Sequence, residues 1–97
     1  MDYKLRWSDE SVRNLEDILD YLKNKWTEKE IKKIKEKLNR QLNITIQNPY
    51  IFPVSNYNPR LRKAVLSKQT TIFYELRDEI IYLAYIHANK RDIGRIK

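Results

Sequence analysis

The sequence predicts a single α+β domain in which a helical hairpin packs on one face of a sheet. Three observations support this fold class. A short strand pattern opens the chain, two segments with apolar residues at helical spacing follow, and the second half is rich in strand-forming residues. Helices that precede a run of strands are typical of a sheet covered on one face. The other face would then be free to bind a partner.

The N-terminal segment predicts a strand followed by a helix. Residues 3–7 alternate apolar and polar side chains, which is the pattern of a half-buried strand. Ser8 is a favourable helix N-cap, and Asp9 and Glu10 follow where the helix dipole stabilises negative charge. We expect the helix to end at residues 23–25. Its apolar stripe consists of Val12, Leu15, Ile18, Leu19 and Leu22.

A second helix begins at Thr27. Thr27 and Glu30 form a capping box, in which the hydroxyl and the carboxylate each accept a hydrogen bond from a backbone N–H. Asn48-Pro49 ends the helix, because the residue before a proline avoids the α conformation. The short link around Trp26 makes the two helices an antiparallel hairpin. The buried side of the second helix carries Ile31, Ile34, Leu38, Leu42 and Ile46.

The second half of the chain predicts a loop and three antiparallel strands. Residues 49–59 hold all three prolines and predict an ordered loop. Asp78 and Glu79 form a tight turn, and residues 88–97 form a short tail. We expect one domain that spans residues 1–97. The predicted strands, rich in β-branched and aromatic residues, are residues 61–66, 70–76 and 80–86.

Composition restricts the classes of function. The chain has no cysteine, which excludes disulfides and cysteine-ligated metal sites, and its one histidine and one glycine offer neither a histidine cluster nor a phosphate-binding glycine loop. We therefore expect no metal and no cofactor. No apolar run approaches the ~18 residues needed to cross a bilayer. The N-terminus also lacks the layout of a signal peptide, so we expect a cytoplasmic protein.

Charge is distributed unevenly along the chain, whose net charge is +7. Residues 1–26 carry five Lys/Arg against six Asp/Glu, whereas residues 49–97 carry nine against four. The imbalance predicts a positive surface built mainly from the second half, which would suit a polyanion or an acidic partner protein. A basic surface that serves only solubility fits the charge equally well.

In order and spacing, nearly the whole chain resembles the RelE/ParE toxins of bacterial type II toxin–antitoxin systems. In that family a strand leads into a helical hairpin, then a loop with Asn-Pro, then a three-stranded antiparallel run. The resemblance includes the helix junction at residues 21–27 and the Leu-Arg that opens the strand at residue 61. The remaining matches are residues 48–53, the aromatic strand at 71–74, and Ile86-His87 followed by Arg91-Asp92.

This resemblance implies a toxin that a cognate antitoxin protein neutralises. RelE-like members cut mRNA in the ribosomal A site, and ParE-like members inhibit DNA gyrase. The junction around Trp26 and the ending of the chain look closer to ParE-like sequences, and the basic residues cluster less tightly than a ribosomal nuclease site would require. We therefore favour a ParE-like toxin that binds a target protein such as DNA gyrase. The alternatives are a RelE-like ribosome-dependent mRNA endonuclease and a relative that only pairs with an antitoxin.

The candidate catalytic residues apply only to the endonuclease alternative. Metal-free RNA cleavage needs a group that activates the 2′-hydroxyl, positive charge for the phosphate, and a proton donor. Tyr85 and His87 lie two residues apart on a strand and share a face of the sheet. The resemblance places them where ribosome-dependent members keep catalytic or base-stacking groups, and it places Arg62 within the sheet. Arg62 could instead pair with Glu75 on the neighbouring strand, and a lone histidine is commonly a structural or surface group.

Further cations and aromatic residues have two interpretations each. Lys63, Arg77 and Arg91 are candidates for binding the target or nucleic acid, although Lys63 and Arg77 could equally be solvated charges at the sheet edge. Trp7, Phe73 and Tyr74 are better explained as core than as stacking platforms. Three rings fall in the predicted loop, where they either cover the sheet edge or form part of a protein interface. These are Tyr50, Phe52 and Tyr57.

Overall fold

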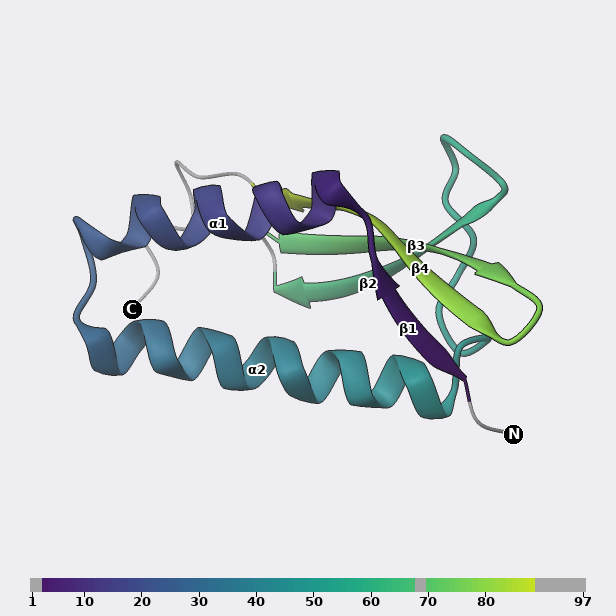
Figure 1. The fold of residues 1–97 in the computed structure, drawn as a ribbon, viewed down its shortest axis with the longest axis horizontal. Coiled ribbons are helices and arrows are strands. Elements are labelled where there is room, and N and C mark those ends of the chain that lie inside the picture. Colours follow the sequence, from purple (N-terminus) through teal and green to yellow (C-terminus); the bar gives the residue numbers. More distant parts are fainter. Residues whose placement is uncertain (1–2, 68–69, 89–97) are drawn as a thin grey trace.

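The fold is known from a computed structural model that describes residues 3–67 and 70–88. The elements are β1 (Lys4–Trp7), α1 (Asp9–Lys23), α2 (Glu28–Gln47), β2 (Leu61–Ser67), β3 (Thr70–Arg77) and β4 (Ile80–Ala88). Both helices lie on one face of a single sheet (Figure 1), with α1 against β4 and α2 against β2. The predicted α+β class is therefore confirmed. Most of the predicted tail lies outside the described residues.

The sheet is mixed rather than wholly antiparallel. Its strand order is β1-β4-β3-β2, and the β2–β3 and β3–β4 pairs are antiparallel as predicted. The first strand, however, pairs in parallel with β4, with Leu5 opposite Ile81. The predicted antiparallel run covers β2, β3 and β4, and no direction was predicted for β1. No tight turn joins β1 to β4, so the path of the chain through the helical hairpin sets the direction of β1.

Both predicted helix starts are confirmed. Ser8 accepts a hydrogen bond from the Ser11 N–H at 3.0 Å. In the capping box the Thr27 N–H donates to the Glu30 carboxylate at 3.2 Å, and the Glu30 N–H donates to the Thr27 hydroxyl at 3.3 Å. The predicted apolar stripe of α1 is confirmed at Leu15, Ile18, Leu19 and Leu22. It differs at the first turn, where Ser11 is buried and Val12 is exposed. Ser11 tolerates burial since its hydroxyl donates to the Ser8 carbonyl at 2.8 Å.

The hydrophobic core lies between the two helices and the sheet. Tyr74 is fully buried there, as predicted. Two other aromatic predictions were wrong, because Trp7 is exposed and Phe73 points to the face of the sheet away from the helices. The buried cluster contains Ile18, Leu22, Ile31, Leu38, Leu42, Ala64, Ile72, Tyr74, Ile81, Leu83 and Ile86.

A β-bulge interrupts β4 at Ala84. Tyr74 lies opposite Leu83, but its neighbour Phe73 lies opposite Tyr85, so Ala84 is an extra residue in the ladder. An extra residue shifts the alternation of side chains by one position. The β4 side chains that face the helices are therefore those of residues 81 and 83 before the bulge, and those of residues 86 and 88 after it.

Side chains of the first helix and its cap hold the bulge in place. The Ser8 hydroxyl donates to the Ala84 carbonyl at 2.7 Å, and the Ile86 N–H donates to the Asn14 side-chain oxygen at 2.9 Å. Backbone groups at a bulge lose their regular ladder partners and need others when they are shielded from water. Helix α1 and its N-cap supply these partners, so packing of the helix and the course of β4 depend on each other.

We predict that Asn14→Ala lowers the free energy of unfolding by about 1 to 2 kcal/mol, because the Ile86 N–H loses its acceptor. Urea denaturation followed by circular dichroism would measure the change. Asn39→Ala, on an exposed position of α2, is a matched control that makes the same substitution within a helix. Equal stability of the two variants would contradict a role for Asn14 at the bulge.

Candidate functional site

The face of the sheet away from the helices, called here the outer face, brings together several predicted site residues. The bulge directs Tyr85 and His87 to this face, where they lie opposite Phe73 and Thr71. Lys63 also points to the outer face, since it lies opposite Phe73 from the other side. Strands β2 and β4 therefore place Lys63, Tyr85 and His87 on one surface. The sequence predicted that Tyr85 and His87 share a face, and it gave no indication of which one.

An aromatic pair forms the middle of the outer face. The rings of Phe73 and Tyr85 are stacked, with centroids 4.6 Å apart and planes at 21°. Both side chains are half-buried. A stacked pair beside Lys63 can pack against a flat aromatic or apolar group while the ammonium attracts negative charge.

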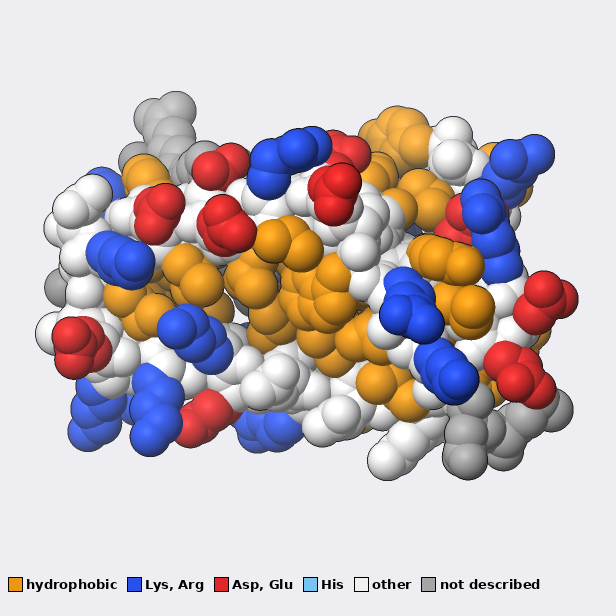
Figure 2. Space-filling view, viewed as in Figure 1, with side chains coloured by type: hydrophobic (Ala, Val, Ile, Leu, Met, Phe, Trp, Pro, Cys, Tyr) orange, Lys and Arg blue, Asp and Glu red, His pale blue; other side chains and the backbone are white. Residues whose placement is uncertain are grey.

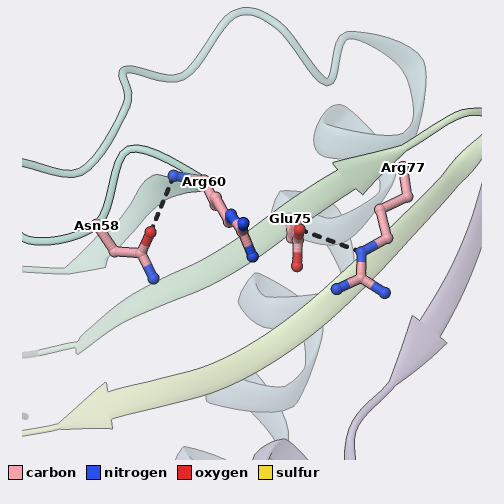
Figure 3. Close-up of polar contacts among 4 residues, drawn as sticks. All are labelled: Asn58, Arg60, Glu75 and Arg77. Carbon is pink, nitrogen blue, oxygen red and sulfur yellow. Dashed lines mark hydrogen bonds and ion pairs between the residues drawn. The ribbon is translucent and has the colours of Figure 1, made fainter.

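Arg77 lies at one end of the outer face and forms an ion pair with Glu75. Its Nε is 3.1 Å from the Glu75 carboxylate, and its guanidinium carbon lies 5.4 Å from the centroid of the Tyr82 ring. The hydrogen bond with Glu75 raises the pKa of the Arg77 guanidinium. Figure 3 shows Glu75 between Arg77 and the side chain of Arg60, which reaches in from the end of the loop before β2. The two guanidinium groups thus lie on either side of one carboxylate.

Arg62 lies on the opposite side of the sheet from Tyr85 and His87. It is directly opposite Tyr74, so its side chain points to the helix-covered face. Its guanidinium donates to the Phe52 carbonyl at 2.7 Å and to the Tyr50 carbonyl at 3.4 Å. The predicted pairing with Glu75 is wrong, because Glu75 points to the outer face. The candidate catalytic set of Arg62, Tyr85 and His87 is therefore not assembled on one surface.

The start of the same loop explains the burial of Tyr74. The Tyr74 hydroxyl donates to the Pro49 carbonyl at 2.7 Å, and its ring meets the Phe52 ring edge to face at 6.4 Å. Burial raises the pKa of Tyr74 to about 12, while the positive charge of Arg62 acts in the opposite direction. The sequence predicts Tyr74 in the core but does not indicate its hydrogen-bond partner, because Pro49 lies 25 residues earlier in the chain.

His87 is exposed at the rim of a small cavity. The cavity, of about 280 Å³, lies between α1 and the end of β4, and its lining also includes Glu10, Asp17 and Tyr85. Two carboxylates that line the same cavity as the only histidine make this region unfavourable for an RNA phosphate. Among residues 3–67 and 70–88, no three His, Cys, Asp or Glu side chains are grouped as a metal site would need. Arg91, the remaining predicted binding residue, lies outside the described residues.

These features define a class of protein: a small α+β domain whose helices cover one face of a mixed sheet and whose outer face carries aromatic and cationic side chains. Neither helix, in the part of the chain that the structure describes, is long and apolar enough to span a membrane. No protein-family model and no curated protein matches the sequence.

Solved structures with the same fold come from toxin–antitoxin systems. A chain of the chromosomal ParDE system from P. aeruginosa superposes with a TM-score of 0.76 at 15% identity, covering 89% of this chain and 95% of that one. A chain of the E. coli DinJ-YafQ toxin–antitoxin complex gives 0.62 at 13% identity, covering 91% and 93%. A mutant of E. coli toxin RelE in the free state gives 0.60 at 16% identity, covering 98% and 92%. The chain has the RelE/ParE fold, as the sequence resemblance predicted.

Proposed function

We propose that this chain is the toxin of a bacterial type II toxin–antitoxin system and arrests growth by binding a target protein, with DNA gyrase as the expected target. The proposal treats residues 1–97 as one toxin domain that acts in the cytoplasm. The position of Arg62 is the observation that favours protein binding over RNA cleavage. A guanidinium that braces a loop on the helix side of the sheet is not available to a phosphate near His87.

A ribosome-dependent endonuclease is the second candidate, and one observation favours it. Lys63, Tyr85 and His87 lie on the outer face, where a cation, a proton donor and an imidazole could meet an RNA backbone. The negative charge of Glu10 and Asp17, which line the same cavity as His87, weighs against it. If the endonuclease candidate is correct, His87→Ala and Lys63→Ala are the informative variants, because neither side chain braces the loop before β2.

An acidic antitoxin suits the surface of the helical hairpin. Helix α2 carries six Lys/Arg against three Glu, whereas α1 carries two against five Asp/Glu. Figure 2 shows this contrast, with apolar side chains visible between the two helices. Excess positive charge on one helix accelerates association with an acidic partner, and an apolar strip between helices can receive an amphipathic segment. One solved structure with the same fold is a toxin–antitoxin complex.

The first experiment follows synthesis rates after induction in a bacterial host. We expect thymidine incorporation to fall within minutes while methionine incorporation persists, because gyrase inhibition blocks DNA replication first. Purified protein should then inhibit DNA supercoiling by gyrase. An immediate fall in methionine incorporation would instead support the endonuclease. Unchanged growth and unchanged incorporation of both precursors would contradict the toxin assignment.

A further inference from the structure

One part of this highly charged chain carries no charge at all. Residues 41–59 contain no Asp, Glu, Lys or Arg, although these types make up 34% of the sequence. The stretch covers the last two turns of α2 and the loop before β2 as far as Pro59. Figure 1 shows this loop at the end of the molecule away from the α1–α2 turn. A surface loop without charge is unusual for a protein that keeps a net charge of +7.

The loop, here called the 49–59 loop, turns apolar side chains to solvent. Tyr57 is 95% exposed, and Tyr50 and Ile51 are each 64% exposed. Val54 is exposed as well. Of the three rings in the loop, only Phe52 packs against the core. Coverage of the sheet edge therefore accounts for Phe52, and the contact of the Tyr50 ring with the Arg62 guanidinium accounts for Tyr50. Neither interaction accounts for the exposure of Ile51, Val54 and Tyr57.

Several hydrogen bonds fix the backbone of the loop. The Lys63 N–H donates to the Pro53 carbonyl at 2.9 Å, and the Ser55 N–H donates to the Leu61 carbonyl at 2.7 Å. At the tip, the Tyr57 N–H donates to the Ser55 hydroxyl at 3.2 Å. The contacts of Arg62 and Tyr74 described above secure the start of the loop. An interface on a prearranged loop loses little conformational entropy on binding, so exposed aromatic side chains there contribute more of their burial energy to affinity.

We propose that the 49–59 loop is a preformed protein-recognition element and that Tyr57 anchors it in an apolar pocket of the target protein. The proposal rests on the proposed function, namely that this chain acts by binding a protein. Tyrosine is among the residues that dominate binding energy at protein interfaces.

The absence of charged residues from the loop favours a target protein over nucleic acid or an acidic antitoxin as its partner. Nucleic acid is bound mainly through phosphate contacts with Lys and Arg, and residues 41–59 offer none. An acidic antitoxin is better matched by the basic residues of α2 than by an uncharged loop. The uncharged and largely apolar composition of the loop fits a target protein with an apolar pocket.

The test compares the potency of variants in growth arrest. Wild type and Tyr57→Ala are expressed from a graded promoter, and the cellular amount that halves the growth rate is measured by quantitative immunoblot. We expect Tyr57→Ala to require at least about tenfold more protein, since truncation of an anchor residue commonly weakens binding by that factor or more. Tyr57→Phe keeps the ring and should stay within about threefold of wild type.

Controls separate recognition from folding. Val12→Ala truncates an exposed apolar side chain on α1, away from the loop, and should leave potency unchanged. The urea midpoints of wild type and Tyr57→Ala should agree, because the Tyr57 side chain is almost fully exposed. Equal potency of Tyr57→Ala and wild type would overturn the role of the loop while the toxin assignment stands. Failure of wild type to arrest growth would overturn both.

Two further measurements test other occupants. Binding of a fluorescent single-stranded RNA oligonucleotide should be the same for wild type and Tyr57→Ala. A loss of RNA affinity of about tenfold or more would show that the loop binds nucleic acid, and the proposal would fail. Sedimentation velocity should give the same mass for both proteins. A wild-type dimer that Tyr57→Ala converts to a monomer would assign the loop to a second copy of the chain and would also overturn the proposal.

Discussion

Replacing Arg62 with alanine is expected to lower the free energy of unfolding by about 2 to 3 kcal/mol. The guanidinium donates to the carbonyls of Phe52 and Tyr50 and lies 5.1 Å from the centroid of the Tyr50 ring. Hydrogen bonds from charged groups contribute about 1.5 to 3 kcal/mol, and a cation over an aromatic ring adds about 0.5 to 1 kcal/mol. For a domain of this size the loss corresponds to a fall in Tm of roughly 10 to 20 °C, measurable by calorimetry.

Two control variants make this expectation specific to the loop contacts. Arg60→Ala removes an exposed guanidinium two residues away and should change the free energy of unfolding by less than about 0.5 kcal/mol. Arg62→Lys keeps the charge but loses the planar donor group, so its stability should fall between those of wild type and Arg62→Ala. Equal stability of Arg62→Ala and Arg60→Ala would contradict the structural role of Arg62.

The expected instability changes how a toxicity assay on Arg62 must be interpreted. If Arg62→Ala loses toxicity, the cause can be a partly unfolded protein or a displaced 49–59 loop. Loss of toxicity in this variant therefore does not identify a nuclease. Residues that lie on the outer face and do not brace the loop, such as His87, give a cleaner answer.

Alkaline pH is expected to destabilise the protein through Tyr74. The pKa of this hydroxyl is about 12 in the folded protein and near 10.0 in the unfolded chain. Between these values the unfolded chain releases a proton that the folded protein retains, so stability falls as pH rises. One pKa unit corresponds to about 1.36 kcal/mol, which gives a loss of about 1.4 kcal/mol by pH 11 and about 2 kcal/mol by pH 12. The contribution is fully present below pH 10.

The Tyr74→Phe variant isolates this effect from the titration of other groups. Phenylalanine cannot titrate, so the difference in unfolding free energy between wild type and Tyr74→Phe should shrink as pH rises from 9 to 12. Urea denaturation at each pH would measure it. At neutral pH, Tyr74→Phe should cost about 1 to 2 kcal/mol, because the buried Pro49 carbonyl loses its donor. A pH-independent difference would show that Tyr74 titrates normally in the folded protein.

The sequence by itself determined the elements and their order, because local physical chemistry specifies them. The caps at Ser8 and Thr27 depend on side chains within three residues, and both are present in the structure. Asn48-Pro49 ends α2 through a steric effect on the preceding residue. Apolar periodicity predicted most core positions of α2, and strand composition located β2, β3 and β4 to within two residues.

Only the tertiary structure decided which face each candidate site residue occupies. One extra residue at Ala84 reverses the alternation of β4 and sends Tyr85 and His87 to the outer face. The bulge is stable because Ser8 and Asn14 satisfy its backbone groups from more than 70 residues away. No local pattern in the sequence predicts hydrogen bonds between residues so far apart in the chain.

The same limit applies to Arg62 and to the direction of β1. Arg62 was predicted to act on a ligand or to pair with Glu75, and the structure assigns it to loop carbonyls on the other side of the sheet. The parallel pairing of β1 with β4 follows from the route of the chain through the helical hairpin. Residue types and spacing specify which interactions a side chain can make. Which of them it does make depends on partners that only the folded chain brings near.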